Sequence, residues 1–484
     1  MGNNQKINMT EGPLFGKILK FVLPLMLTNI LQVLYNAADM VIVSLSSEPD
    51  AVGAIGTTTA MINLFINIFI GFSVGANVVV ARYIGANAQD RVSKAVHTAI
   101  LASLIFGTAG GIIGIAFHKP ILSIMGISGK LLELSSKYVV IYFLGAPFLS
   151  LTNYAVAILR AEGDTKTPLF VMTGTGLLNV ALNLFFVLSI SMSVEGVALA
   201  TTIANAASAA ILLVRLSRSK GICRFFFKKL RLDKTSLKNI VYIGLPAGIQ
   251  GALFSVSNML IQSSIIKVNN ILTPAGINYQ PVVKGNAAVA NLEGFAYTAT
   301  NSVYQASITF TGQNMGAKKY NRIGLVMRNC YLITFFVAEI SAGLILLFRN
   351  PLLSLYGVVK GAQGTGEAIA YSAAITRLLY MFPAYFTLAF MEVGSGILRG
   401  LGKSATSTVV SLIGSCLFRI VWIFTVFAAR PTLGIIYVSY PISWAMTALI
   451  HFLCSTAVRK KLLLTQKATE KTEVSISQIS CKIK

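Results

Sequence analysis

Long apolar stretches separated by short polar segments recur along the whole chain. A helix needs about 20 mostly apolar residues to cross the roughly 30 Å hydrocarbon core of a membrane. Twelve stretches meet this requirement, and they predict an all-α polytopic membrane protein with twelve membrane-spanning helices. The predicted spans are 14–44, 52–80, 92–117, 132–159, 168–190, 195–216, 238–266, 286–313, 324–348, 367–398, 404–427 and 433–458.

The eighth stretch, 286–313, is the weakest of these, because it contains Glu293 and many Asn, Thr and Gln residues. Without it the chain would have eleven spans and its termini would lie on opposite sides. With twelve spans and both termini inside, the inner segments carry 30 of the 40 Lys and Arg residues and the outer loops carry 8. Cytoplasmic loops concentrate Lys and Arg, so this asymmetry predicts twelve spans and cytoplasmic termini.

Composition supports the membrane assignment. Hydrophobic residues make up 55% of the 484 residues and charged residues 12%, with a net charge of +24 and a mean hydropathy of +0.72. A soluble domain carries roughly 25% charged residues. A soluble enzyme, a disordered scaffold and a nucleic-acid-binding domain are therefore poor explanations. The excess of basic residues indicates contact with lipid at the membrane edges and no nucleic-acid partner.

No motif predicts a cofactor or an enzymatic reaction. Cys223, Cys330, Cys416, Cys454 and Cys481 all lie in predicted helices or inner segments, and no Cys/His metal spacing occurs. A P-loop is absent, so this chain does not hydrolyse ATP. No nucleophile–base cluster is found either. We therefore expect a protein that is not an enzyme and that uses no cofactor besides a coupling ion.

A basic stretch, 217–237, divides the chain into two similar halves. We predict an N-lobe (1–216), a cytoplasmic inter-lobe loop, a C-lobe (238–458) and a basic cytoplasmic tail (459–484). Near the start of each half, LPLMLTNILQVLYN resembles LPAGIQGALFSVSN. This places Pro24 and Asn36 on Pro246 and Asn258, at a common offset of 222 residues.

Two further motifs follow the same repeat. YIGANAQDRV matches NMGAKKYNRI, with Gly85 on Gly316, and ILRAEGDTK matches ILRGLGKSA, with Arg160 on Arg399. Each half has an even number of spans, so the lobes share one orientation and are related by an axis along the membrane normal. Many secondary transporters have this plan, with the substrate path between the lobes. We expect Arg160 and Arg399 in tight loops at the cytoplasmic interface, where they would not bind substrate.

These motifs carry a family resemblance. The segments LPLMLTNILQVLYNAADMVIV, GFSVGANVVVARYIGA and ILRAEGDTKTP, with LNVALNLFFV and GVALAT, resemble the MATE (multidrug and toxic compound extrusion) transporters, and second-half segments such as FMEVGSGILRGLG resemble bacterial members. The resemblance covers residues 10–460. It implies a two-lobe antiporter in the bacterial plasma membrane that exports organic compounds, often cationic, in exchange for H⁺ or Na⁺.

The resemblance also assigns roles to residues of the N-lobe. Asp39 matches the ion-coupling carboxylate of the family, and Pro24 matches its helix-bending point. Asn179, Asn183 and Thr201 match polar positions that line the same cavity, and with Asp39 they would bind the ion if the coupling ion is Na⁺. Many relatives carry Asp where this chain has Asn183, so the identity of the ion stays open.

The residues themselves support part of this assignment. Asp39, Glu293, Glu339 and Glu392 fall inside predicted spans, where a lone carboxylate costs roughly 2.5–3.5 kcal/mol and is expected to face a cavity or a partner. Asn179 and Asn183 lie four residues apart, on one helix face. They could bind Na⁺, orient Asp39, or form ordinary hydrogen bonds between helices.

In the second half, Arg419 lies in mid-helix and needs a buried counter-charge, for which Glu293 and Glu392 are the candidates. Either glutamate could instead attract a cationic substrate. Helix packing is the simpler interpretation of Glu339. Our candidates for the substrate cavity are Tyr35, Asn36, Gln250, Asn258, Glu293, Tyr297 and Glu392.

We therefore predict a monomeric, ion-coupled exporter of cationic or amphipathic small molecules. Two arginines, Arg377 and Arg419, lie within spans against four carboxylates, so an anionic cavity and cationic cargo are expected. A flippase for lipid-linked precursors would need a strongly cationic cavity. A membrane receptor or scaffold is a further alternative, although the chain has no sizeable soluble segment.

Overall fold

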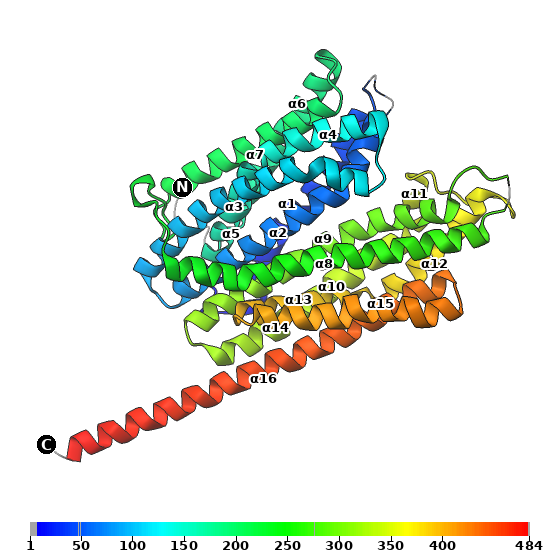
Figure 1. Cartoon of the computed structure of the whole chain (residues 1–484). Helices are drawn as coiled ribbons and strands as arrows, with labels where there is room; N and C mark the ends of the chain where they lie inside the picture. The colour runs from blue at the N-terminus through cyan, green and yellow to red at the C-terminus, as the bar shows by residue number, and fades with distance from the viewer. Residues whose placement is uncertain (1–6, 47, 49, 275, 483–484) are drawn as a thin grey trace.

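Helices account for nearly all of the structure, a computed structural model that describes residues 7–46, 48, 50–274 and 276–482 (Figure 1). Within these residues there is no strand. The helices of the N-lobe are α1 (Leu14–Val43), α2 (Ala51–Gly85), α3 (Gln89–Ile124), α4 (Gly129–Leu144), α5 (Ala146–Glu162), α6 (Lys166–Leu184), the π-helical turn η2 (Phe185–Ser189) and α7 (Val194–Ser217).

The helices of the C-lobe follow a connection that contains the short turn η3 (Phe227–Lys229). They are α8 (Lys234–Leu272), α9 (Pro281–Gly316), α10 (Tyr320–Leu347), α11 (Arg349–Ser354), α12 (Gly366–Met381), η4 (Phe382–Ala384), α13 (Tyr385–Gly400), α14 (Ser404–Ser411), η5 (Leu412–Leu417), α15 (Phe418–Trp422), η6 (Ile423–Phe427) and α16 (Leu433–Lys482).

Within the described residues, twelve helical segments correspond to the twelve predicted spans. In the described part of the chain, ten helices are long and apolar enough to cross a membrane, and the pair α4 and α5, bent by 48°, forms an eleventh candidate. Pro147, near the start of α5, has no amide hydrogen to continue the ladder of α4, and this accounts for the break. The predicted twelve-helix, two-lobe fold is confirmed.

The twelfth segment, α9, is the stretch that looked weakest in the sequence. It forms one helix of 36 residues, although it is not among the helices apolar enough for a span by composition. Its neighbours explain this, because α9 packs against α1, α2, α10, α12 and α13. Its polar side chains therefore face protein and the central cavity, where lipid does not select against them.

The lobes meet through reciprocal helix pairs. Helix α2 packs along α8, and α1 packs against α9. The first half of α1 belongs to a core cluster with the C-lobe, which includes Phe21 and Phe310, whereas its last residues, Ile42 and Val43, join an N-lobe core. Pro24 lies inside α1, on the part that packs against the C-lobe. Helix α1 thus contacts both lobes.

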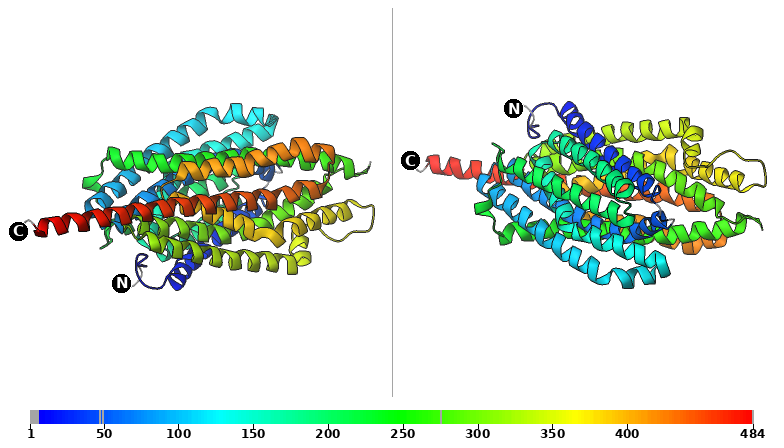
Figure 2. Two further views of the ribbon diagram at one scale, coloured as in Figure 1. Left: turned by 90° about the horizontal axis from the view of Figure 1, so that it is seen from below. Right: turned by 90° about the horizontal axis from the view of Figure 1, so that it is seen from above.

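Both the α7–α8 connection and the extension of α16 lie at one end of the bundle, which we call the basic end (Figures 1 and 2). The predicted tail, 459–484, continues α16 as a helix that projects past the bundle up to Lys482. The connection is anchored where the Phe226 amide donates to His97 Nε2 at 3.0 Å. Asp233 then caps α8 by accepting the Ser236 amide at 2.8 Å.

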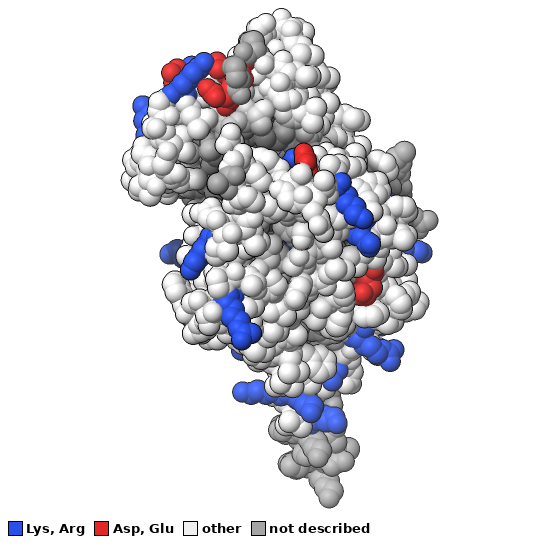
Figure 3. Space-filling view, turned by 90° about the vertical axis from the view of Figure 1, so that its right-hand side faces the viewer, with Lys and Arg blue, Asp and Glu red and all other residues white. Residues whose placement is uncertain are grey.

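Figure 3 views the opposite end of the molecule, where charged side chains are sparse over a surface made mostly of other residues. Among the described residues, ion pairs on the N-lobe here join Lys130 to Glu48 at 2.6 Å and Lys137 to Glu133 at 2.9 Å. Lysine–carboxylate pairs also occur at the basic end, where Lys94 lies 2.7 Å from Asp90.

Candidate functional site

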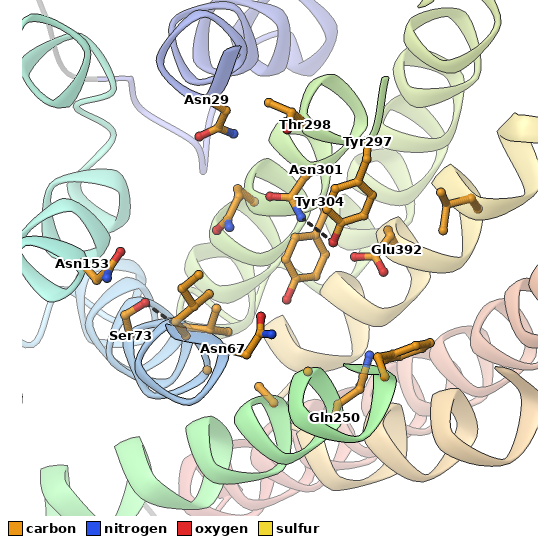
Figure 4. Close-up of a pocket in the computed structure, with 18 of the residues that line it drawn as sticks. Asn29, Asn67, Ser73, Asn153, Gln250, Tyr297, Thr298, Asn301, Tyr304 and Glu392 are labelled. Atoms are coloured by element: carbon orange, nitrogen blue, oxygen red, sulfur yellow. Dashed lines mark hydrogen bonds between the residues drawn. The ribbon is translucent and has the colours of Figure 1, made fainter. Parts of the chain in front are cut away.

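A cavity of about 630 Å³ lies between the two lobes (Figure 4). Its walls come from α1, α2, α5 and α6 of the N-lobe and from α8, α9, α13, α15 and α16 of the C-lobe. The polar side chains of the N-lobe wall are mostly amides, with Ser73 and Arg160 besides them, whereas the C-lobe wall has aromatic side chains and further charged groups. The polar and aromatic wall residues are Asn29, Gln32, Asn36, Asn67, Ser73, Asn77, Asn153, Arg160, Gln250, Phe254, Ser255, Asn258, Glu293, Tyr297, Thr298, Asn301, Tyr304, Gln305, Glu392, Arg399, Arg419, Tyr440 and Trp444.

Most of the predicted cavity residues lie on this wall: Asn36, Gln250, Asn258, Glu293, Tyr297 and Glu392. Tyr35 is not among the wall residues. Its hydroxyl donates to the Thr173 carbonyl at 3.3 Å, and its ring lies so close to Gly176 that a Cβ there would stand 2.0 Å from it. Tyr35 therefore packs α1 against α6 and does not line the cavity.

Arg160 and Arg399 also line the cavity, so the prediction that they sit in cytoplasmic loops is wrong. Both residues occupy the last turn of a helix, α5 and α13 respectively. Side chains on a helix lean toward its N-terminus, so these two reach back into the bundle although their backbones lie near its basic end. The repeat pairs Asn36 with Asn258 and Arg160 with Arg399 thus face one shared space.

The charge of the wall differs from the predicted one. Two carboxylates, Glu293 and Glu392, stand against three guanidinium groups, Arg160, Arg399 and Arg419. Asp39 and Glu339 are not among the wall residues. The prediction of an anionic cavity is therefore wrong, because it counted residues by span and not by the direction in which their side chains point.

The ion pair inside the C-lobe is formed by Arg377 and not by the predicted Arg419. Glu293 pairs with Arg377 through one short contact between its Oε2 and Arg377 Nη2, and Arg377 Nη1 donates to Asn286 Oδ1 at 2.6 Å. Within the described residues Arg419 forms no ion pair within 4 Å, which corrects the predicted pairing with Glu293 or Glu392. Its Nε donates instead to Ser443 Oγ at 2.9 Å.

Around Glu392 the wall is aromatic. Figure 4 shows its carboxylate beside Tyr297, pointing into the cavity. Among the described residues no hydrogen bond to Glu392 is present. Two turns further along α13, Arg399 donates to the Tyr304 hydroxyl and, at 2.9 Å, to Gln250 Oε1. Neutral groups thus hold Arg399, and Glu392 remains available to a cation.

A second polar site lies inside the N-lobe, apart from the cavity wall. Here the structure brings together Asp39 of α1, Asn179 and Asn183 of α6, and Thr201 of α7. Asn183 is fully buried and its Nδ2 donates to Asp39 Oδ1. When the Asn179 amide is oriented to satisfy both of its neighbours, its Nδ2 donates to the same oxygen at 2.8 Å and its Oδ1 accepts the Thr201 amide at 3.3 Å.

This arrangement suits an ionised carboxylate, which accepts hydrogen bonds and donates none. Rotation of either amide would present Oδ1 instead, an acceptor for the proton of a neutral Asp39 or a ligand for a cation. Asn183 Oδ1 is buried without a hydrogen-bond partner, so one such acceptor is already unused. In the described part of the chain no group of three or more His, Cys, Asp or Glu side chains could hold a metal ion.

The structure adds a set of residues that sequence reasoning missed, at the closed basic end of the cavity. Thr309 donates to Asn77 Oδ1 at 3.1 Å, and Gln313 donates to the Ala161 carbonyl at 2.7 Å. Arg82 Nη2 donates to the Gly400 carbonyl at 3.1 Å. These bonds connect the N-lobe to the C-lobe. The repeated Gly-Ala motif was the available signal, because it marks where the two lobes touch.

Comparisons with known proteins agree with this architecture. A model of the MatE family matches residues 24–185 and 280–425. The probable multidrug resistance protein YoeA of Bacillus subtilis (strain 168) is 25% identical over 455 residues, which cover 92% of this chain and 94% of that protein. The multidrug export protein MepA of Staphylococcus aureus (strain bovine RF122 / ET3-1) is 24% identical over 283 residues, 58% of this chain and 63% of that protein.

Solved structures share the fold. One of them is the outward-facing conformation of a multidrug resistance MATE family transporter of the MOP superfamily. It superposes with a TM-score of 0.84 at 20% sequence identity, over 96% of this chain and 99% of the other. At this identity the likeness concerns the fold alone.

Proposed function

The chain belongs to the MatE family of transporters, and we propose that it is a secondary antiporter that expels amphipathic organic compounds in exchange for an inward-moving ion. YoeA and MepA, whose names refer to multidrug resistance and export, support the cargo class. The proposed working unit is the single chain in a bacterial plasma membrane, with both termini in the cytoplasm, because one chain supplies both lobes and the basic segments.

One observation carries the proposal: Asp39, a half-buried carboxylate, lies in a polar site separate from the cavity that would hold the cargo. An antiporter needs two ligands that influence one another through a shared conformational change. Helix α1 provides the connection. It carries Asp39 and also wall residues such as Asn36, and its Asn29 donates to Ser302 of α9 at 3.1 Å.

The proposed coupling starts at the Asp39 carboxylate. In its ionised form it accepts hydrogen bonds from amides of α6, which hold α1 against the N-lobe. Protonation removes the charge that these donors stabilise and requires an acceptor instead, so an amide must rotate or α1 must shift. Because α1 also packs against α9, such a shift would reach the interface between the lobes and change access to the cavity.

The donor set favours H⁺ over Na⁺ as the coupling ion. A Na⁺ site needs several oxygen ligands, as hard cations generally do, whereas here amide nitrogens face the carboxylate. The site also has one acid, since Asn183 replaces a possible second one. A proton requires only the carboxylate and one acceptor.

Transport in proteoliposomes tests this proposal. Rhodamine B and its ethyl ester would be offered separately under an imposed pH gradient or an imposed Na⁺ gradient. We expect uphill accumulation of a dye under the pH gradient, and its loss to the level of protein-free liposomes in Asp39→Asn, whose amide cannot load and release a proton.

Glu339→Gln is the matched control, because Glu339 is an intramembrane carboxylate on α10 that is absent from the cavity wall. It should keep the wild-type rate. Equal accumulation by wild type and Asp39→Asn, at equal protein levels, would refute the role of Asp39. Accumulation driven by Na⁺ alone would keep antiport but refute coupling to H⁺.

A further inference from the structure

Arg419 is a buried cation on the cavity wall, and no described residue supplies it with an anionic partner. Its side chain comes from α15, and the residue is 3% exposed. Its guanidinium carbon stands 4.1 Å from the ring centre of Tyr440 and 5.5 Å from that of Trp444. Nε donates to Ser443, but Nη2 has no hydrogen-bond partner in the part of the chain that the structure describes. One edge of the guanidinium group is therefore unused.

Neither nearby carboxylate satisfies this charge. Glu293 is held by Arg377, and among the described residues Arg419 has no ion pair. A buried ion costs several kcal/mol when it is left without a compensating partner. Groups that are buried and charged are normally paired, so an unpaired guanidinium that faces a cavity points to a ligand that supplies the anion.

The other arginines of the wall also contribute to an excess of positive charge. Arg160, on the N-lobe side, has a buried Nε without a hydrogen-bond partner, and the bonds of Arg399 go to neutral Tyr304 and Gln250. With three guanidinium groups against two carboxylates, the wall has a formal charge of +1. A cavity of this charge is unfavourable for a simple organic cation.

Glu392 provides a negative group on the cavity wall. Its carboxylate faces the cavity beside Tyr297 (Figure 4), and the Tyr297 ring offers a face to which a cation is attracted. The ring of Tyr304 already has the Arg399 guanidinium over it, 5.6 Å from its centre. The cavity thus presents a negative group on α13 and an unpaired positive group on α15. A ligand with both charges on an aromatic or apolar body would complement both groups.

We propose that the cavity binds a zwitterionic amphiphile, whose carboxylate or other anionic group pairs with Arg419 and whose cationic group faces Glu392. This inference rests on the proposed function in one respect, namely that the cavity holds the cargo. It changes the expected cargo from an organic cation to a molecule that must also carry an anionic group.

Rhodamine B and its ethyl ester form a matched pair of probes, because esterification removes the carboxylate and leaves the cationic ring system. Binding to the detergent-solubilised full chain would be followed by fluorescence polarisation. A hydrogen bond to a charged group contributes about 1.5–3 kcal/mol, so we expect rhodamine B to bind at least about tenfold more tightly than the ester. Equal or tighter binding of the ester would overturn the proposal.

Variants test whether Arg419 is responsible for the preference for rhodamine B over its ester. Arg419→Gln should remove the preference for rhodamine B, and Arg419→Lys should restore part of it. Arg349 is an exposed arginine outside the cavity wall, so Arg349→Gln should leave the ratio unchanged. A ratio that survives Arg419→Gln would refute the assignment of the anion to this residue.

A competition experiment uses only the wild-type protein, so its outcome does not depend on whether a variant folds. Benzoate, a simple aromatic carboxylate, should displace rhodamine B and should leave the binding of the ester unaffected. Displacement of neither dye would contradict the proposal. These are equilibrium measurements without a gradient, so tight binding of rhodamine B combined with no driven transport would refute the antiport proposal and leave this one standing.

Discussion

The two lobes have the same helical plan but differ in the charged groups of their interiors. The N-lobe site has one carboxylate, Asp39, surrounded by amides, whereas the C-lobe wall has Glu293 paired with Arg377 and a further unpaired Arg419. The repeat offset of 222 places Asp39 on Ile261, a buried apolar residue. The C-lobe therefore lacks the carboxylate that distinguishes the N-lobe site.

At the basic end the same two lobes remain alike. A Cβ at Gly85 would lie 1.9 Å from the Gln313 carbonyl oxygen, and a Cβ at Gly316 would lie 1.9 Å from that of Arg82. These contacts are reciprocal between α2 and α9. The comparison teaches that symmetry is kept where the lobes contact each other, and is lost at the sites that we propose for the ion and the cargo.

The largest effect on stability is expected from breaking the C-lobe ion pair. Arg377→Gln leaves Glu293, whose side chain is only 16% exposed, without its partner, which should lower the free energy of unfolding by about 3–5 kcal/mol. Thermal unfolding in detergent measures this change. The double variant Arg377→Gln with Glu293→Gln should recover most of the loss, and a single variant as stable as the wild type would show that the pair does not stabilise the C-lobe.

An exposed ion pair of the N-lobe is the control for that experiment. Lys137 and Glu133 are 47% and 66% exposed at their side chains, and pairs of this kind contribute about 0–1 kcal/mol. Lys137→Gln should therefore hardly change the melting temperature. A drop as large as that of Arg377→Gln would mean that the lobes do not differ in the way described.

A smaller effect tests the shared closure. In Gly316→Ala the new methyl group meets the Arg82 carbonyl, so α2 and α9 must separate and the closed basic end loses stability. We expect dye transport in proteoliposomes to fall about tenfold, which corresponds to about 1.4 kcal/mol. Gly294→Ala on the same helix, where a Cβ meets nothing within 4 Å, should keep the wild-type rate. Equal rates in both variants would contradict the closure.

The smallest expected effect concerns the start of α8, the C-lobe counterpart of α1. Asp233 caps α8, whereas α1 begins without a side-chain cap. Loss of such a cap costs about 1 kcal/mol, so Asp233→Ala should lower the free energy of unfolding by that amount at pH 7. Asp50→Ala, at the start of α2 where no side-chain cap bond forms, is the matched control.

The effect of Asp233→Ala should depend on pH. The hydrogen bond from the Ser236 amide lowers the pKa of Asp233 below its ordinary value of 3.8. A lowered pKa in the folded state stabilises the protein above the ordinary value, and this contribution is lost as the pH falls through the folded-state pKa. The difference between wild type and Asp233→Ala should thus shrink below about pH 4. A difference that is constant down to pH 2 would exclude the ionised cap as its cause.

Much of the fold was predictable because span length, loop charge and internal repeats are linear features of the sequence. Even the polar α9 followed from counting charges on either side of it. The cluster of Asp39, Asn179 and Asn183 was partly visible, since two asparagines four residues apart must share a helix face. Its separation from the cavity was not visible, because that depends on how α1 is rotated against α6.

The positions and partners of the buried arginines could not be predicted from the sequence. Arg160 and Arg399 looked like loop residues, yet the backward lean of helical side chains carries them onto the cavity wall. The choice of Arg377 over Arg419 as the partner of Glu293 depends on which faces of α9 and α12 meet. No periodicity within one helix contains that information.

The central claim, that the N-lobe binds the coupling ion and the C-lobe recognises the cargo, is tested most directly by measuring binding and driven transport of rhodamine B in the same two variants. Asp39→Asn should bind the dye with wild-type affinity but fail to accumulate it under a pH gradient. Arg419→Gln should bind it about tenfold more weakly yet still accumulate it when the dye is saturating. Loss of binding and of driven transport in parallel in both variants would contradict the division between the lobes.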